Sequence, residues 1–495
     1  MPKNTSSLEL TLSGRPADQS LTDWLYAELR RAILEGRLRP GSRLPASRDF
    51  AVQHSLSRGT VVNVFERLQS EGYLRSHVGS GTWVNKQVSA ARAARSEVVR
   101  EPAYVHRVIS TYTRPKPLLG IQWAKTTRPF QMRDPALREF PAKLWGHLAA
   151  RRARSFSSWL QVEDSGRGYL PLREAIAEYL GSSRGVTCTA DQIVIISGVQ
   201  QALDVLSRLL LKPDDPVWME DPGYFGASIA FTNAGAKIIP VPVDQYGLCV
   251  SRGERLCANA RGVYLTPAHQ FPLGMTMPLD RRMAVLNWAA RTGAFVIEDD
   301  YDSEYRFQGR PVPALQSLDR GSNVILIGSF SKLLFPSLRL GYVVLPQSLA
   351  DFFVAFRSRT DFRALHFDQA VLCDFIAGGH LGRHIRRMRD LYASRLAALI
   401  EDGRRYLAGL LRISSIQAGL YTAGFLENGM TSQEAESAAA AHGLDVLSLS
   451  RFCFKCSDPG GILLGFAAFD EASIRKRLRQ LAAALNPRNP RSHAE

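Results

Sequence analysis

The sequence predicts an α/β protein in two parts: a small helical module that ends in a β-ribbon, and a large domain built on a mostly parallel sheet. Three observations support this fold class. At 495 residues, the chain is too long for one ordinary domain. Residues 18–84 contain three helical apolar patterns followed by an alternating one. From about residue 118, short β-rich runs alternate with helical stretches, which is typical of a parallel sheet with helices on both faces.

The composition is that of a globular protein that can bind nucleic acid. Hydrophobic residues make up 45% of the chain and charged residues 22%, while the net charge of +16 fits a nucleic-acid partner. The N-terminus lacks the pattern of a signal peptide, and no apolar run approaches the roughly 20 residues of a membrane helix. We therefore expect a soluble, cytoplasmic protein.

The six cysteines are few and scattered, as expected in a reducing compartment. Cys453 and Cys456 form a CxxC motif. Neither a second CxxC nor a nearby pair of histidines completes a zinc site. We expect these two cysteines to be structural or incidental, and we expect no metal centre.

The first two helices are predicted from periodicity and punctuation. A helix over residues 21–36 starts at Thr22 or Asp23 as a cap and stops at Gly36. After a turn at Pro40-Gly41, residues 46–54 form a short second helix. The apolar stripe of the first helix consists of Leu21, Leu25, Leu29, Ile33 and Leu34.

A third helix, capped by Ser57, is followed by a two-stranded ribbon with a glycine turn at Gly79-Ser80-Gly81. This order of elements is the pattern of a winged helix-turn-helix, whose third helix fits a major groove and whose ribbon tip can approach a minor groove. The alternative is a small structural module. The third helix buries Val61, Val64, Phe65 and Leu68 and leaves Arg58, Thr60, Asn63 and Arg67 outside that stripe.

The run from LRPGSRLPASRDF to GSGTWV resembles the GntR-type winged helix across almost every motif position. The resemblance implies a DNA-binding domain over residues 18–84. Ala46 stands where the family often has serine, which removes one phosphate contact. The candidate DNA-binding residues are Arg48, Ser57, Arg58, Thr60, Asn63 and Gly79.

Residues 85–117 lack a clear period and are basic, which marks a domain boundary. We favour a flexible or partly helical tether over a basic arm that adds phosphate contacts.

The large domain, residues 118–346, alternates strands with helices such as 199–212 and 279–291. Ligands of such sheets bind beyond the carboxyl ends of the strands, so chemistry-bearing residues should follow the strands. The predicted strands are IVIIS (193–197), PVWME (216–220), KIIPVPV (237–243), GVYLT (262–266), AFVIED (294–299) and NVILIGS (323–329).

The residues that follow these strands match what pyridoxal phosphate requires. The cofactor needs a lysine for its aldehyde, a carboxylate at its pyridine nitrogen, a phenol at its ring oxygen, a stacking ring and an anion cup. Each residue alone is more commonly a surface, loop or capping group, but the whole set in order is less easily accidental. The set comprises Lys332, Asp299, Tyr301, Tyr224, Gly198, Val199, Gln200, Ser329, Ser331 and Arg339.

Residues from about 165 to 346 resemble the fold-type I aminotransferase domain of the MocR-type branch of GntR regulators. The motifs GRGYLPLREAIAEYL, EDPGY, TPAHQFPLG, EDDYDSEY and SFSKLLFPSLRLGY carry the match. The resemblance implies pyridoxal 5'-phosphate as the cofactor. It also implies Lys332 in the internal aldimine, Asp299 at the pyridine nitrogen, Tyr301 at the ring oxygen, Tyr224 as the stacking ring and Arg339 at the phosphate.

Two positions remain open within that resemblance. Asp300 is the alternative to Asp299, because neighbouring acids leave the register uncertain. TPAHQFPLG departs from the Asn-Pro-Thr/Ser-Gly of aminotransferases, so Gln270 or His269 stands in for the missing asparagine.

Residues 347–495 are helix-rich, with a strand at 461–469, and resemble the small aminotransferase domain. Aminotransferases usually place here an arginine for the substrate carboxylate. Arg451 is the candidate for this effector-binding role, against the alternative of a surface arginine.

The combined parts predict a DNA-binding transcription regulator that senses pyridoxal phosphate, an amine or an amino acid through an aldimine at Lys332. Its partners are double-stranded operator DNA and the small-molecule effector, and the resemblance implies a homodimer. One alternative is an active aminotransferase with a DNA-binding appendage, for which a residual half-reaction is plausible. Another is an adaptor with an inactive cofactor site.

Overall fold

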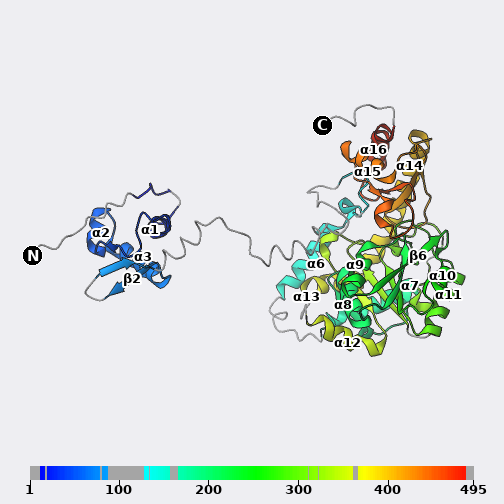
Figure 1. The fold of residues 1–495 in the computed structure, drawn as a ribbon, viewed down its shortest axis with the longest axis horizontal. Helices are drawn as coiled ribbons and strands as arrows, with labels where there is room; N and C mark the ends of the chain where they lie inside the picture. The colour runs from blue at the N-terminus through cyan, green and yellow to red at the C-terminus, as the bar shows by residue number, and fades with distance from the viewer. Residues whose placement is uncertain are drawn as a thin grey trace, which may run out of the picture. The chain divides into compact units, whose positions relative to one another are not determined.

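The computed structural model describes residues 12–16, 19–77, 81–86, 128–132, 134–155, 166–309, 312–320, 323–359 and 366–486. The chain divides into two compact units, Met1–Pro115 and Lys116–Glu495, which are taken separately below. Figure 1 shows the elements of each unit. Gly79 and most of the predicted tether lie outside the described residues.

The first unit contains helices α1 (Leu21–Glu35), α2 (Ser47–Gln53) and α3 (Arg58–Ser70), as predicted. Gly36 ends α1 in the left-handed conformation at φ 78°, which glycine adopts without a Cβ penalty. The predicted cap of α1 was wrong. Ser20, and not Thr22 or Asp23, caps the helix, because its hydroxyl accepts the backbone N–H of Asp23 at 3.1 Å.

The predicted two-stranded ribbon is present, and a third, short strand, which was not predicted, joins it. Strand β3 (Gly81–Val84) lies between β2 (Leu74–His77) and the short β1 (Arg43–Leu44), and all pairs are antiparallel. The buried face of α3 is confirmed, since Val61, Val64, Phe65 and Leu68 all belong to the core of the unit. Leu34 was wrongly placed on the buried stripe of α1, because it is 37% exposed.

The second unit is built on an eight-stranded sheet in the order β4-β11-β10-β9-β8-β5-β6-β7. All six strands predicted for it are present, and β4, β10, β9, β8, β5 and β6 run parallel, as predicted. The prediction missed β7 and β11, which are antiparallel to their neighbours. The strands are β4 (Ile193–Ile196), β5 (Pro216–Asp221), β6 (Lys237–Asp244), β7 (Gly247–Leu248), β8 (Gly262–Leu265), β9 (Phe295–Asp300), β10 (Val324–Ser329) and β11 (Gly341–Val344).

Helices cover both faces of this sheet, because alternate residues of the strands join different cores. Val217 and Met219 of β5 pack into the core that contains α8, α9 and α12, while Trp218 faces the core of α10 and α11 and stacks on Trp288 at 3.9 Å. In the described part of the chain, no helix is long and apolar enough to cross a membrane. The helices are α6 (Ala142–Arg154), α7 (Leu170–Arg184), α8 (Val199–Leu210), α9 (Phe225–Asn233), α10 (Val250–Cys257), α11 (Leu279–Thr292), α12 (Gln347–Arg357) and α13 (His366–Ala377).

A smaller α+β part completes the second unit, as predicted. Its antiparallel sheet has the order β12-β13-β15-β14. The strand predicted over 461–469 is shorter, Gly461–Gly465. The further elements are β12 (Leu411–Ile413), β13 (Tyr421–Leu426), β14 (Leu447–Ser448), α14 (His380–Tyr406), α15 (Ser432–Ala441), α16 (Glu471–Leu485) and the 3-10 helix η8 (Leu449–Phe452).

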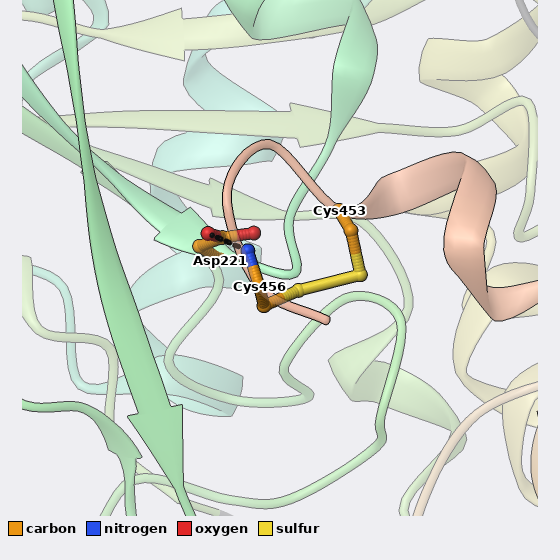
Figure 2. Close-up of side chains that lie close together, drawn as sticks. All are labelled: Asp221, Cys453 and Cys456. Atoms are coloured by element: carbon orange, nitrogen blue, oxygen red, sulfur yellow. Dashed lines mark hydrogen bonds between the residues drawn. A yellow bond between two sulfur atoms is a disulfide. The ribbon is translucent and has the colours of Figure 1, made fainter. Parts of the chain in front are cut away.

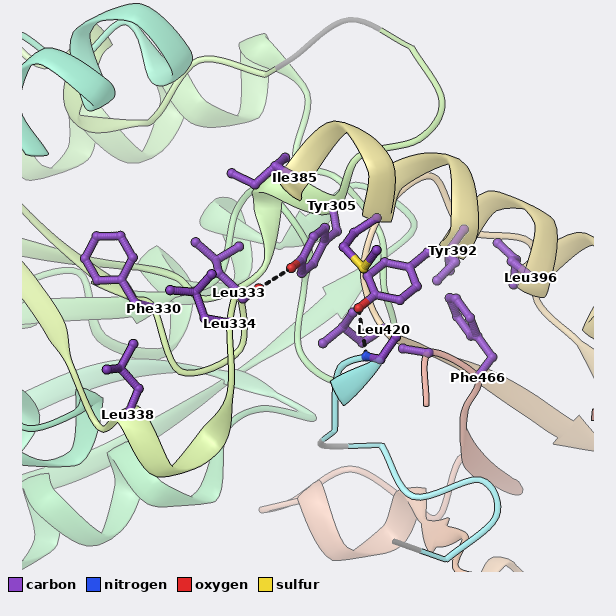
Figure 3. Close-up of a cluster of buried hydrophobic side chains, with 14 of the residues drawn as sticks. Tyr305, Phe330, Leu333, Leu334, Leu338, Ile385, Tyr392, Leu396, Leu420 and Phe466 are labelled. Carbon is purple, nitrogen blue, oxygen red and sulfur yellow. Dashed lines mark hydrogen bonds between the residues drawn. The ribbon is translucent and has the colours of Figure 1, made fainter. Parts of the chain in front are cut away.

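A shared hydrophobic core joins the loop after β10 to the long helix α14 (Figure 3). Leu333 and Leu334 are each 1% exposed within it, and the Tyr305 hydroxyl donates a hydrogen bond to the Leu333 carbonyl. Tyr305 in turn packs edge-to-face on Tyr392 of α14. This core therefore fixes the backbone immediately after Lys332.

Candidate functional site

A cavity of about 180 Å³ opens at the carboxyl ends of the parallel strands. This is where ligands of such sheets bind. Several residues predicted from separate motifs meet there: Val199, Tyr224, Asp299, Tyr301 and Lys332. The remaining lining residues are Met132, Tyr264, Thr266 and Phe271.

Lys332 follows β10 and is half-buried at the cavity wall. Its Nζ lies 4.2 Å from the centroid of the Tyr301 ring. The next two residues, Leu333 and Leu334, are buried in the core described above, which restricts where the lysine can point. A primary amine is thereby held beside an aromatic ring in a partly desolvated site.

Asp299 is the last residue but one of β9 and is only 5% exposed. Its Oδ2 accepts a hydrogen bond from the Tyr264 hydroxyl at 2.6 Å, while Oδ1 has no hydrogen-bond partner among the described residues. Burial raises the pKa of Asp299 to about 6, against the opposing effects of the Tyr264 hydrogen bond and the Lys332 charge. The cavity thus contains a carboxylate oxygen that can receive a cationic N–H.

Asp300 faces the other side of the sheet. Successive side chains of a strand point to opposite faces, and the carboxylate of Asp300 forms a buried ion pair with Arg184 at 2.8 Å. It does not line the cavity. Of the two neighbouring acids, only Asp299 is positioned for a ligand there.

The Tyr301 hydroxyl belongs to a buried hydrogen-bond chain. It donates to the His269 carbonyl at 2.9 Å and lies 2.8 Å from the Tyr421 hydroxyl. The ring of His269 is held by Asp302, whose Oδ1 lies 2.9 Å from Nδ1. Burial raises the pKa of Tyr301 well above its ordinary value, so the phenol remains a hydrogen-bond donor.

Tyr224 lies between β5 and α9 and supplies a ring to the cavity. Phe271 contacts it edge-on, with 5.6 Å between ring centroids. Burial, followed by the charge of Asp299, raises the pKa of Tyr224 to about 12. The ring is therefore neutral and braced from one side.

A candidate anion site lies at the N-terminus of α8. Gly198 has φ 126°, and a Cβ added there would meet the Arg339 guanidinium at 3.5 Å. This close approach brings an arginine to the free N–H groups that begin the helix at Val199 and Gln200. Nearby in sequence to Lys332, the Ser329 hydroxyl accepts the backbone N–H of Ser331 at 3.3 Å.

Two residues predicted for the site, Gln270 and Arg451, bond to other groups of the protein instead. The Gln270 side chain donates to the carbonyls of Pro222 and Phe271 and accepts the N–H of Leu273, so it braces its own loop and does not line the cavity. Arg451 forms a two-pronged ion pair with Glu436, at 2.7 Å and 2.5 Å. Its charge is therefore already matched within the protein.

Four wall residues were not predicted from the sequence: Met132, Tyr264, Thr266 and Phe271. Tyr421, whose hydroxyl contacts that of Tyr301, was also missed. Tyr264 pairs in register with Ile297 and so faces the same side as Asp299 two residues later, a register that no single motif shows. Met132 and Tyr421 come from distant segments without a motif.

The winged unit carries the second candidate site. Arg48, Arg58 and Asn63 are exposed on α2 and α3. Ser57 caps α3, because its hydroxyl accepts the N–H of Thr60 at 3.0 Å, and it also lies 2.8 Å from the Thr60 hydroxyl. A cluster of exposed polar side chains at the start of α3 is the arrangement that a DNA groove or phosphate requires.

The cavity residues fit pyridoxal phosphate on the grounds of this geometry. The unpartnered Oδ1 of Asp299 suits a protonated pyridine nitrogen, and the Gly198–Arg339 approach suits a phosphate. Lys332 and Tyr224 supply the amine and the ring.

Two protein families match the chain. Residues 21–84 match the bacterial regulatory proteins of the gntR family, and residues 146–434 match aminotransferase class I and II. The probable rhizopine catabolism regulatory protein MocR of Rhizobium meliloti is 38% identical over 473 residues, which cover 95% of each chain. The HTH-type pyridoxine biosynthesis transcriptional regulator PdxR of Corynebacterium glutamicum is 30% identical, over 94% of this chain and 96% of that one.

Solved structures agree with the fold of the second unit. The α-aminoadipate aminotransferase LysN of Thermus thermophilus, solved with N-(5'-phosphopyridoxyl)-L-leucine, matches with a TM-score of 0.69 and 26% identity over 76% of this chain and 97% of that one. The kynurenine aminotransferase of Pyrococcus horikoshii matches with a TM-score of 0.68 and 25% identity, over 80% and 98%. The fold-type I aminotransferase-like architecture is confirmed.

Proposed function

This chain belongs to the MocR-type branch of the GntR-like transcription regulators, and from that membership we propose how it works. It binds operator DNA through its winged helix and holds pyridoxal phosphate in the cavity at Lys332. It senses the cofactor itself, or an amine or amino acid that reacts with it. The observation that carries this proposal is the meeting of Lys332 with a buried, half-unpaired carboxylate in one cavity.

The DNA-binding part of the proposal rests on α3 and its neighbours. Arg48 and Arg58 are exposed cations that can neutralise phosphates, while Asn63 can reach a base edge from the outer face of α3. Residues 85–117 act as a tether to the second unit, and a homodimer would present two winged helices to one operator.

Within the cavity, each side chain has a separate task. When bound, pyridoxal phosphate supplies an aldehyde that reacts reversibly with primary amines, and a ring that withdraws electrons. Lys332 would offer the amine, and Asp299, through its unpartnered Oδ1, would hold a proton on the pyridine nitrogen. Tyr224 would cover the ring, and Arg339 with the start of α8 would bind the phosphate.

Sensing is better supported than sustained transamination. Arg451, the arginine proposed for a substrate carboxylate, is occupied by Glu436. The loop that contains Gln270 also lacks the asparagine of aminotransferases. The Gln270 amide instead forms hydrogen bonds with the backbone of Pro222 and Leu273. Binding of one amine by the aldehyde of the cofactor would need neither feature.

The test is an absorption spectrum of the purified protein with pyridoxal phosphate. We expect a band near ~420 nm that is lost in Lys332→Ala. Lys237→Ala, which removes an exposed lysine of β6, is the matched control and should keep the band. Operator binding, measured by fluorescence anisotropy, should change when the cofactor or a reactive amine is added. A wild-type protein without the band would contradict the proposal, as would fast steady turnover with amino donors and 2-oxo acids.

A further inference from the structure

The loop that contains Cys453 and Cys456 is wrapped around a buried carboxylate. Asp221, the last residue of β5, is 5% exposed. It accepts three consecutive backbone N–H groups, from Phe454 at 2.8 Å, Lys455 at 3.0 Å and Cys456 at 2.9 Å. Figure 2 shows Asp221 beside Cys456 and the disulfide. All three hydrogen bonds can form in only one backbone conformation of the loop, so together they hold the loop in that conformation.

A disulfide between Cys453 and Cys456 closes a ring over the same residues, where sequence analysis expected structural or incidental cysteines. A carboxylate oxygen of Asp221 and both sulfurs lie within 4.8 Å of one another. In the reduced state, a thiolate there would be repelled by the carboxylate, whereas the disulfide carries no charge. Both cysteines are half-buried, so small thiols and disulfides can reach them.

The same loop is bonded to the wall of the cavity. Its neighbour Phe452 accepts the backbone N–H of Gly223 at 3.0 Å, one residue before the cavity ring Tyr224. The Phe452 ring also packs edge-on against Phe271, a second lining residue, with 5.0 Å between centroids. A change in the loop is therefore passed to two walls of the cavity through direct contacts.

We propose that Cys453 and Cys456 form a reversible redox couple whose oxidised state tightens the cavity around its ligand. The chemistry is thiol–disulfide exchange with a low-molecular-weight disulfide RSSR. One cysteine thiolate attacks a sulfur of RSSR and releases RS⁻. The second cysteine thiolate then attacks the mixed disulfide, forms the Cys453–Cys456 bond and releases another RS⁻. The two cysteine protons pass to the leaving thiolates, so the products are the protein disulfide and two RSH.

The direction follows from pre-organisation. The cross-link restricts the loop to the conformation that meets Asp221 and supports the residues beside Tyr224, so less order must be gained when a ligand binds. This part rests on the proposed function, with pyridoxal phosphate as the ligand. We expect the oxidised protein to bind it at least about fivefold more tightly than the reduced protein. By linkage, saturating cofactor should then shift the midpoint potential of the couple about 20 mV more negative.

The experiment is a redox titration of the full chain in glutathione buffers, without and with saturating pyridoxal phosphate. Free thiols are alkylated, and the peptide that contains residues 453–456 is quantified by mass spectrometry. The cofactor Kd is measured by absorbance in both redox states. Cys453→Ser should abolish the redox dependence of the Kd, while Cys257→Ser, which removes a thiol elsewhere, should keep it.

Reversible oxidation together with the two linked shifts would support the proposal. A pair that stays reduced in every buffer would overturn it, as would a Kd that is equal in both states. Stoichiometric zinc held by the reduced protein and lost in Cys453→Ser would also overturn it, in favour of a metal site made with Asp221. Absence of the cofactor band in both redox states would refute the proposed function itself. A band that is present, but with a Kd independent of redox state, would refute only the redox proposal.

Discussion

Replacing Asp299 with asparagine should stabilise the cofactor-free protein while weakening cofactor binding. Burial raises the pKa of Asp299 from 3.8 to about 6, so the empty site disfavours the ionised form. The stability that the protonated group contributes is fully present below pH 3.8 and is lost as the pH rises through 6. A pKa of about 6 in the folded protein, against 3.8 ordinarily, corresponds to about 3 kcal/mol of stability lost at neutral pH.

The Asp299→Asn variant would avoid this loss, because an asparagine side chain does not ionise. The oxygen of the new amide can still accept the Tyr264 hydroxyl, and its N–H₂ group can donate to water in the cavity. For the second unit, of about 380 residues, an unfolding entropy of about 2.1 cal/mol/K per residue converts 3 kcal/mol into a rise of about 4 °C in Tm.

The assay is a thermal melt of both proteins from pH 4 to pH 8, without cofactor. The two Tm values should nearly coincide at pH 4, separate as the pH rises from about 4 to about 6, and stay apart above that, with Asp299→Asn higher. The control is Asp300→Asn, which leaves the buried guanidinium of Arg184 without its charge partner and should destabilise the protein by about 3–5 kcal/mol. A Tm difference for Asp299→Asn that is independent of pH, or a lower Tm at pH 8, would refute the reasoning.

Three further predictions concern single side chains. Arg58→Ala should lower the slope of log Kd against log salt for operator DNA by about 0.9, whereas Arg67→Ala should change it little, because Asp23 and Glu71 already pair with Arg67; equal slopes for both variants would contradict the assignment. Ser57→Ala should destabilise the winged unit by about 1 kcal/mol, measured by its melt, because the N–H of Thr60 loses its acceptor. Leu333→Ala should cost about 2–5 kcal/mol and weaken the cofactor band, because the core beside Lys332 is emptied; an unchanged melt would rule out that anchoring role.

The parts of the fold that were predictable are those in which one local pattern decides the outcome. Each parallel strand is a short apolar run that ends in polar residues, so six strands and the residues after them could be placed. Strand β11 was missed because its run, Gly341–Val344, closely follows Arg339 and begins inside the motif SFSKLLFPSLRLGY, which was assigned to the cofactor site. Strand β1 has two residues and no alternation to detect.

The parts of the site that were not predictable depend on partners far away in sequence. Neither Arg451 nor Arg184 shows in its own motif that an acid, Glu436 or Asp300, neutralises it. The choice between Asp299 and Asp300 needed the register of β9, because a shift of one residue exchanges the two faces of the sheet. The contact between the disulfide loop and Asp221 joins two segments that lie more than 200 residues apart.

An effector can shift this protein between states only through contacts that differ between those states. The wall of the cavity contains such a junction. The 2.8 Å contact between the hydroxyls of Tyr301 and Tyr421 joins the end of the large sheet to the first residue of β13 in the small sheet. Lys332 lies over the same Tyr301 ring, so a ligand that changes the charge or position of this amine would alter the field at both hydroxyls. Burial keeps both phenols protonated, because it raises both pKa values well above their ordinary range. A ligand in the cavity would therefore act on this junction through its hydrogen bonds and packing, and so on the contact between the two sheets.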